Sequence, residues 1–180
     1  DVYKRQEEVI NKYLSDSSVQ IGTTKKSRTD RTGNGKIKAE NVIFINKYNA
    51  PTSEIMAGDY LRIEFEISKD PWIELDKMII ACSFSDALEN RVVTWVSDEM
   101  KHNFDLIKGK CFSLEIPNFN LRPNTYNFNY QISYRGTAIE NFCDVLAFAG
   151  SINVLTSNFF NSGKDVRPGS SLLLDANFKY

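Results

Sequence analysis

The sequence predicts an all-β domain, an antiparallel sandwich or barrel, on three observations. Apolar and polar residues alternate with period two in most segments, as in "DYLRIEFEIS" (59–68) and "TYNFNYQISY" (125–134). Clusters of turn residues separate these segments, and helical spacing occurs in one short stretch alone. A length of 180 residues suits one domain with a substantial core. A sandwich of this kind buries one face of each strand.

The one helical pattern lies near the start of the chain. In "EEVINKYL" (7–14) the apolar residues Val9, Ile10, Tyr13 and Leu14 recur at helical spacing. We interpret residues 1–20 as a linker with a short helix, ahead of a β-domain over residues 21–180. The first six residues, "DVYKRQ", look like a translated sequencing-adapter fragment, so they are expected to be non-native and the natural protein to continue upstream.

The expected strands follow in order, and turns occupy most of the sequence between them. The candidate strands are 35–46, 59–68, 77–84, 91–97, 110–117, 125–134, 141–150 and the tail 172–180. The stretches 49–59, 85–90, 117–125 and 167–171 are interpreted as turns. Five phenylalanines fall on the buried phase of their strands and are expected in the core: Phe65, Phe84, Phe112, Phe128 and Phe148.

Composition excludes several classes of function. There are 22 basic and 23 acidic residues, a net charge of −1, which argues against nucleic acid or an anionic membrane surface as a partner. Cys82, Cys111 and Cys143 are too few and too scattered for a disulfide framework or a zinc site, and each sits among apolar residues. We expect them to be small buried side chains in a cytosolic protein, since neither a signal peptide nor a long apolar run is present.

The stretch "RTDRTGNGKIKAENVIF" (28–44) resembles two ligand-binding loops at once. As a phosphate loop it fails, because Ile37 follows Lys36 where Ser or Thr is required. As a calcium loop it places Asp30, Thr32 and Asn34 at the first three ligand positions, but Asn41 stands where a bidentate acid belongs. The glycines are therefore predicted to make a tight turn into the first strand, and no metal site is predicted.

Catalytic chemistry has little support in the sequence. His102 is the single histidine and lies in a polar stretch, so a nucleophile–histidine pair would depend on it alone. The cysteines lie in apolar surroundings, where thiolates are disfavoured. No catalytic residue is predicted.

The polar side of segment 125–134 is the most distinctive surface of the sequence. Asn127, Asn129, Gln131 and Ser133 alternate with aromatic and apolar residues. Amides and hydroxyls donate and accept hydrogen bonds without charge, as sugars require, and sugars also stack on aromatic rings. An ordinary solvated strand face would show the same pattern.

The order of several segments resembles the Wzt-like C-terminal domain, found on the ATP-binding subunit of polysaccharide ABC exporters. The resemblance runs from about residue 21 to 180 and rests on "RTGNGKIKAENVIF", "GDYL" (58–61), "EIPNFNLRPNTY" (115–126), "YRGTAIENFCDVLAF" and "RPGSSLLLDANFKY". It implies an immunoglobulin-like sandwich of carbohydrate-binding-module type. Two positions depart from the family pattern: Asn124 stands after Pro123 where Gly is frequent, and Glu89 replaces the usual hairpin Gly.

The resemblance also implies partners and a location. The ligand would be a cytoplasmic lipid-linked polysaccharide, either the O-antigen of lipopolysaccharide or a teichoic-acid-like glycan. The chain would hold no cofactor, since ATP and Mg²⁺ would bind an upstream ATPase domain that also contacts the membrane permease. The protein would lie at the inner face of the cell membrane, as a homodimer formed by exchange of the C-terminal strand.

An immunoglobulin-like strand order brings six residues forward as carbohydrate-binding candidates. Segments 77–84, 91–97 and 125–134 would share a sheet, with Ile80, Cys82 and Phe84 inward and Ser83 outward. The candidates are Ser83, Trp95, Asn127, Asn129, Gln131 and Arg135. Trp95 would stack on a sugar if it faces outward, although "RVVTWVS" is apolar on both phases and fits a core tryptophan equally well. Arg135 would anchor an anionic cap such as phosphate.

Two other functions remain open at this point. The sandwich could serve dimerisation or partner contact alone, without binding glycan. It could also be a carbohydrate-binding module of a secreted glycosidase, which three cysteines and the absence of an export signal disfavour.

Overall fold

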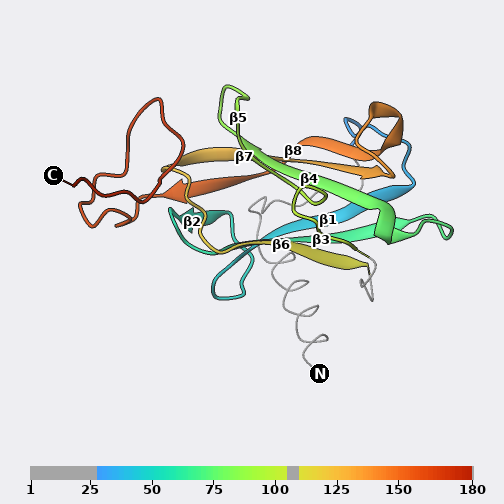
Figure 1. Ribbon diagram of the computed structural model, residues 1–180, viewed down its shortest axis with the longest axis horizontal. Coiled ribbons are helices and arrows are strands. Elements are labelled where there is room, and N and C mark those ends of the chain that lie inside the picture. Colours follow the sequence, from blue (N-terminus) through green and yellow to red (C-terminus); the bar gives the residue numbers. More distant parts are fainter. Residues whose placement is uncertain (1–27, 105–109, 180) are drawn as a thin grey trace.

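A computed structural model describes residues 28–104 and 110–179, and these form two packed β-sheets (Figure 1). One sheet has three strands in the order β1-β3-β6, and the other has five in the order β2-β8-β7-β4-β5. The predicted all-β sandwich is confirmed. The described residues contain only two single turns of 3₁₀ helix, η1 (Leu75–Lys77) and η2 (Ile139–Asn141). The helix predicted at 7–14 lies outside the described residues.

Seven strands lie where the sequence predicts them. The strands are β1 (Ile37–Asn46), β2 (Glu54–Met56), β3 (Leu61–Lys69), β4 (Met78–Ser85), β5 (Arg91–Val96), β6 (Cys111–Ile116), β7 (Asn124–Tyr134) and β8 (Phe142–Leu155). β2 was not predicted, since its three residues lie within a stretch rich in turn residues. It pairs parallel to β8, whereas all other pairs are antiparallel.

The predicted strand at 172–180 is wrong for the described part of that segment. Residues 172–179 have one ladder contact, an isolated bridge between Leu121 and Leu172. The amide of Leu173 donates to the carbonyl of Asn120 at 2.8 Å, and the Leu173 side chain is fully buried. A strand needs a partner edge along its length, and this tail reaches one at a single point.

Aromatic side chains from both sheets fill the core between them. Phe44 and Phe65 of the three-stranded sheet meet Phe128 of the five-stranded sheet, with ring centroids 5.5 and 6.2 Å apart. Phe84 packs against Phe128 at 5.2 Å. The predicted inward phase of β3, β4 and β7 is buried, which confirms the period-two interpretation of those strands.

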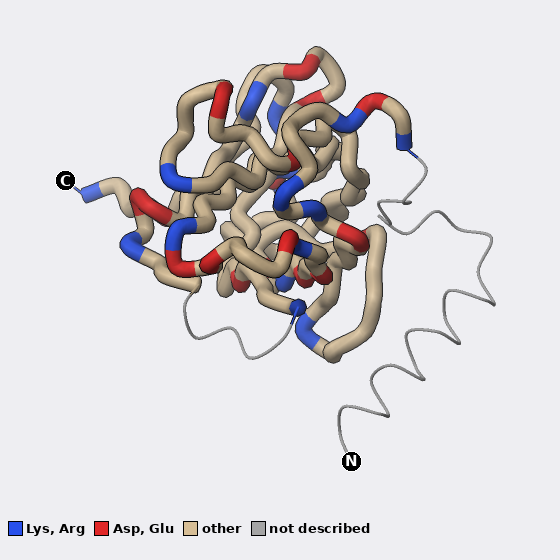
Figure 2. The backbone as a smooth tube through the Cα atoms, turned by 90° about the vertical axis from the view of Figure 1, so that its right-hand side faces the viewer, with Lys and Arg blue, Asp and Glu red and all other residues tan. Residues whose placement is uncertain are grey.

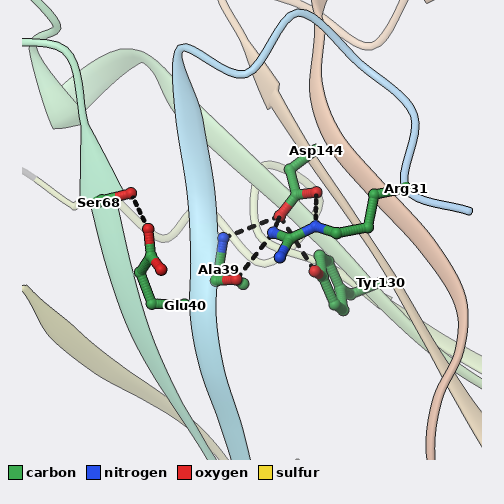
Figure 3. Close-up of polar contacts among 6 residues, drawn as sticks. All are labelled: Arg31, Ala39, Glu40, Ser68, Tyr130 and Asp144. Carbon is green, nitrogen blue, oxygen red and sulfur yellow. Dashed lines mark hydrogen bonds and ion pairs between the residues drawn. The ribbon is translucent and has the colours of Figure 1, made fainter. Parts of the chain in front are cut away.

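A buried polar cluster fixes the glycine-rich loop to the sandwich (Figure 3). Asp144 of β8 is 2% exposed, and its carboxylate accepts hydrogen bonds from Arg31 Nε at 3.0 Å, the Ala39 amide at 2.8 Å and the Tyr130 hydroxyl at 3.0 Å. Arg31 also donates to the Ala39 carbonyl at 2.8 Å. Burial, together with the charge of Asp144, raises the pKa of Tyr130, so its hydroxyl stays a donor. A buried carboxylate persists only when paired in this way.

Candidate functional site

The five-stranded sheet gathers four of the six predicted binding residues on one surface. β4 lies between β7 and β5, and the directly opposed residues are Ser83 with Asn129, Ser85 with Asn127, and Ala81 with Gln131. Opposed residues of an antiparallel pair point to the same face. Cys82 and Phe84 point to the core, so these residues point away from it. We call Ser83, Ser85, Asn127, Asn129 and Gln131 the amide face.

The amide face combines covered hydroxyls with more accessible amides. Ser83 is 6% and Ser85 7% exposed, whereas the three amide side chains of β7 are half-buried. Among the described residues, the side-chain amides of Asn127 and Gln131 have no hydrogen-bond partner. Both groups are uncharged and have hydrogen-bonding capacity left for solvent or a ligand.

Asn129 has a different role from its two neighbours. Its Nδ2 donates to Ser85 Oγ at 2.9 Å, and its Oδ1 accepts from the backbone amide of Phe148 at 3.0 Å. Both ends of the amide are thus engaged within the sheet. Asn129 connects the middle of the amide face to β8.

Phe148 is an exposed aromatic residue on β8, the strand next to β7 of the amide face. The prediction that Phe148 lies in the core is wrong. The ladder between β7 and β8 pairs Phe128 with Gly150 and Tyr130 with Leu146, so that Ala147, Phe148 and Ala149 all stand opposite Asn129. The bulge holds two extra residues, so the same phase of β8 faces the core on either side of it, while Phe148 within it has a φ of 53° and 42% exposure. The period-two pattern of the sequence gives no sign of the extra residues.

Trp95 does not join the amide face. It stands opposite Cys82, which is buried, and its ring meets Phe84 edge-on at 6.3 Å. The half-buried indole therefore points between the sheets. Because "RVVTWVS" is apolar on both phases, only the pairing register could decide the orientation of Trp95.

Arg135 also lies apart from the other candidates. It follows the end of β7, four residues or about 13 Å beyond Gln131 along an extended chain. Its backbone has a φ of 67°, and its guanidinium lies 5.2 Å from the Tyr134 ring. An open pocket of about 500 Å³ at this end of the sheet includes Arg135, Asp98 and His102. An anionic ligand at Arg135 would thus occupy a different place from one on the amide face.

The glycine-rich loop (residues 28–36) runs beside β8 and forms backbone hydrogen bonds with it. Thr32 and Val145 exchange backbone hydrogen bonds of 3.1 and 2.8 Å, and the amide of Gly35 donates to the Cys143 carbonyl at 2.8 Å. Gly33 has a φ of 119°, and a Cβ there would lie 2.5 Å from the backbone carbonyl carbon of Cys143. Glycine is therefore required for this close approach, and the loop forms the tight turn into β1 that the sequence predicts.

The described residues offer no evident centre for metal or nucleophilic chemistry. Within 28–104 and 110–179, no three His, Cys, Asp or Glu residues are grouped so that they could hold a metal ion. Burial raises the pKa of the Cys82 and Cys143 thiols, which disfavours their thiolates. Cys111 is exposed on β6, contrary to the expectation that all three cysteines are buried. His102 lies on the surface with its ring edge-on to Phe104 at 4.6 Å.

Charge is distributed evenly over the described part of the molecule. Figure 2 shows basic and acidic residues interspersed along the backbone instead of gathered on one side. No helix in the described residues is long and apolar enough to cross a membrane.

Comparison with known proteins identifies the same architecture. The family model of the Wzt C-terminal domain matches residues 28–165. A solved structure described as the crystal structure of the C-terminal domain of wzt superimposes with a TM-score of 0.61, covering 85% of this chain and 90% of that one. The two sequences are 13% identical over the match, so this likeness concerns the fold. No curated protein matches the chain.

Proposed function

The chain belongs to the Wzt C-terminal domain family, and from this premise we propose that it is a non-catalytic carbohydrate-binding domain. Its ligand would be a lipid-linked polysaccharide, an O-antigen of lipopolysaccharide or a teichoic-acid-like glycan, awaiting export by an ABC transporter. The observation that carries this proposal is the amide face, where the side-chain amides of Asn127 and Gln131, which bond to no other described residue, lie on one side of a sheet. Neutral amides on a firm sheet surface suit the many hydroxyls of a sugar chain.

The proposal also includes a cellular setting. ATP and Mg²⁺ would bind an upstream ATPase domain, through which this domain would be linked to the membrane permease. The domain would then lie in the cytoplasm, at the inner face of the cell membrane, where lipid-linked glycan is presented.

A glycan array followed by calorimetric titration tests the binding function. The full chain is expected to bind a subset of bacterial polysaccharide fragments, and the double substitution Asn127→Ala, Gln131→Ala is expected to weaken binding about tenfold or more. A matched control replaces Asn118 and Asn177, two exposed amides outside the amide face, by Ala. Equal affinity of the two double variants would remove the amide face from consideration.

Self-association is a second proposed function, favoured by the C-terminal tail. Leu172, Leu174 and Phe178 are exposed apolar side chains on this segment, which has one ladder contact within its own chain. Exchange of the tail between two copies would give it a full partner edge and form a homodimer. Light scattering of the full chain and of a variant lacking residues 174–180 tests this. A dimer that survives the deletion would refute strand exchange, and a dimer without any glycan binding would favour a purely structural role.

A further inference from the structure

We propose that Phe148 is the aromatic stacking platform of the amide face and that this face takes neutral pyranose units. The inference rests on the proposed carbohydrate-binding function and names both the ring and the class of sugar. Sugars present C–H faces that pack on aromatic rings, while their hydroxyls bond to amides at the side. The backbone amide of Phe148 donates to Oδ1 of Asn129, and Asn129 lies between Asn127 and Gln131 on β7.

The backbone at Phe148 is held in a conformation that bulky residues avoid. A φ of 53° is rare for phenylalanine and costs about 1–2 kcal/mol. Such strain persists only where the surroundings enforce it, and it is concentrated at functional positions. A glycine would meet the backbone requirement without strain, yet this position carries a large aromatic ring. A phenylalanine therefore occupies a position whose backbone conformation would favour glycine.

Contacts on both sides hold the bulge in place. Asn129 Oδ1 accepts the Phe148 amide at 3.0 Å. Arg28 Nη1 donates to the Phe148 carbonyl at 2.5 Å, and Nη2 donates to the Ala147 carbonyl at 3.2 Å. Carbonyls that a bulge leaves out of the ladder are thus satisfied by a side chain from the loop before β1. Asn129 and Arg28 act as positioning residues for the ring.

The Phe148 side chain takes no part in the hydrophobic core of the described residues. Phe148 is 42% exposed, lies outside the core cluster, and makes no aromatic contact among the described residues. Leu146 and Ala149, on either side of the exposed pair Ala147 and Phe148, supply the buried side chains of this part of β8. A partly exposed ring on β8, the strand that pairs with the amide-bearing β7, is an arrangement that suits a sugar-binding surface.

The charges around the ring favour a neutral ligand. The amide face consists of hydroxyl and amide groups, and its opposed neighbours on β5 and β8 include Thr94 and Ser151. Arg28 contacts the carbonyls of the bulge, and its charge is offset by an ion pair with Asp30. Arg91, opposite Ser85, lies on the edge strand β5 at the rim. Among the described residues, the members of the amide face carry no charge, so a phosphate or uronate on the ring would find no cation within the face itself.

Titration of ring variants tests the inference. Phe148→Gly removes the ring while suiting the positive φ, so the variant is expected to fold with an unchanged or higher melting temperature. Phe148→Tyr keeps a stacking face. Phe160→Gly serves as the control, since Phe160 is 41% exposed on the C-terminal segment, away from the amide face. The probes are an array of neutral oligosaccharides together with uronic-acid and phosphorylated ones, and the best-bound probe is then titrated by calorimetry.

We expect a neutral probe to bind, about tenfold weaker binding for Phe148→Gly, and binding within about threefold of the original for Phe148→Tyr and Phe160→Gly. Unchanged affinity in Phe148→Gly would overturn the inference while leaving the carbohydrate-binding function intact. Preference for acidic probes would overturn the neutral class. Failure of the original chain to bind any probe would remove the proposed function and the inference with it.

Discussion

Removing one partner of the ion pair between Arg31 and Asp144 should cost several times more stability than removing one partner of a surface pair in the same protein. Arg31→Met removes the guanidinium, keeps an unbranched apolar side chain, and leaves the Asp144 carboxylate buried without its counter-charge. Breaking a buried pair in this way costs about 3–5 kcal/mol. The Arg31 side chain keeps 14% exposure, so we place the cost near the lower end, at about 3 kcal/mol.

A double-mutant cycle isolates the interaction from other effects of each change. Asp144→Asn removes the charge and also weakens the bonds to Ala39 and Tyr130, so its cost is expected to be about 2–3 kcal/mol. The double variant has no uncompensated buried charge. Its loss of stability should therefore be smaller than the sum of the two single losses by about 2 kcal/mol. Urea denaturation followed by circular dichroism measures each free energy of unfolding.

The pair Lys47–Asp59 provides the matched control. Its atoms approach to 2.9 Å, similar to other ion pairs here, but both side chains are partly exposed. Solvent screening limits such pairs to about 1 kcal/mol or less. If the Arg31–Asp144 coupling proves no larger than the Lys47–Asp59 coupling, the buried cluster does not fix the loop in the way argued above.

Three further predictions concern single positions. Gly33→Ala should destabilise the fold by about 3 kcal/mol or more in urea denaturation, because of its φ and the close Cys143 backbone; a smaller loss would show that the loop can move away from β8. Glu89→Gly should raise stability by about 0.5–1 kcal/mol, since Glu89 has a φ of 65° in the β4–β5 turn, and a lower melting temperature would contradict this. Burial raises the pKa of the Cys82 thiol above its value in the unfolded chain, so the folded state favours the protonated thiol. The resulting contribution to the free energy of unfolding is complete below about pH 8.5 and is lost as pH rises. Cys82→Ala should flatten that alkaline decline, and parallel curves would refute the assignment.

The strands of this fold were predictable because burial imposes a period of two. In β3 and β7 every second residue faces the core, and the alternation of the sequence follows directly. β2 was missed for the opposite reason, since its three residues pair with β8 through contacts distant in sequence. The tail at 172–179 has the sequence pattern of a strand but no neighbouring strand to pair with along its length. The sequence pattern of a segment does not show whether such a neighbour exists.

The binding candidates divide in the same way. Ser83, Asn127 and Gln131 fall on the predicted surface, because their strands are regular and adjacent. Trp95 was ambiguous, since both phases of β5 are apolar and only pairing with Cys82 orients the indole. The Phe148 bulge depends on tertiary contacts from Arg28 and Asn129, which no local pattern of β8 records.

The sequence predicts Trp95 on β5 as the stacking ring, whereas the structure favours Phe148 on β8. This difference changes which strands the proposed ligand would cover. A ring on β5 would draw a sugar chain over β4 and β5, towards the edge strand. A ring on β8 places it over β7 and β8, where the amides of Asn127 and Gln131 are accessible and the hydroxyl of Ser83 is nearly covered. Replacing Gln131 should therefore weaken glycan binding more than replacing Thr94 of β5, although both are polar residues on the same face. Calorimetric titration of Gln131→Ala and Thr94→Ala with the same glycan distinguishes the two paths, and the reverse order of affinities would return the ligand to β5.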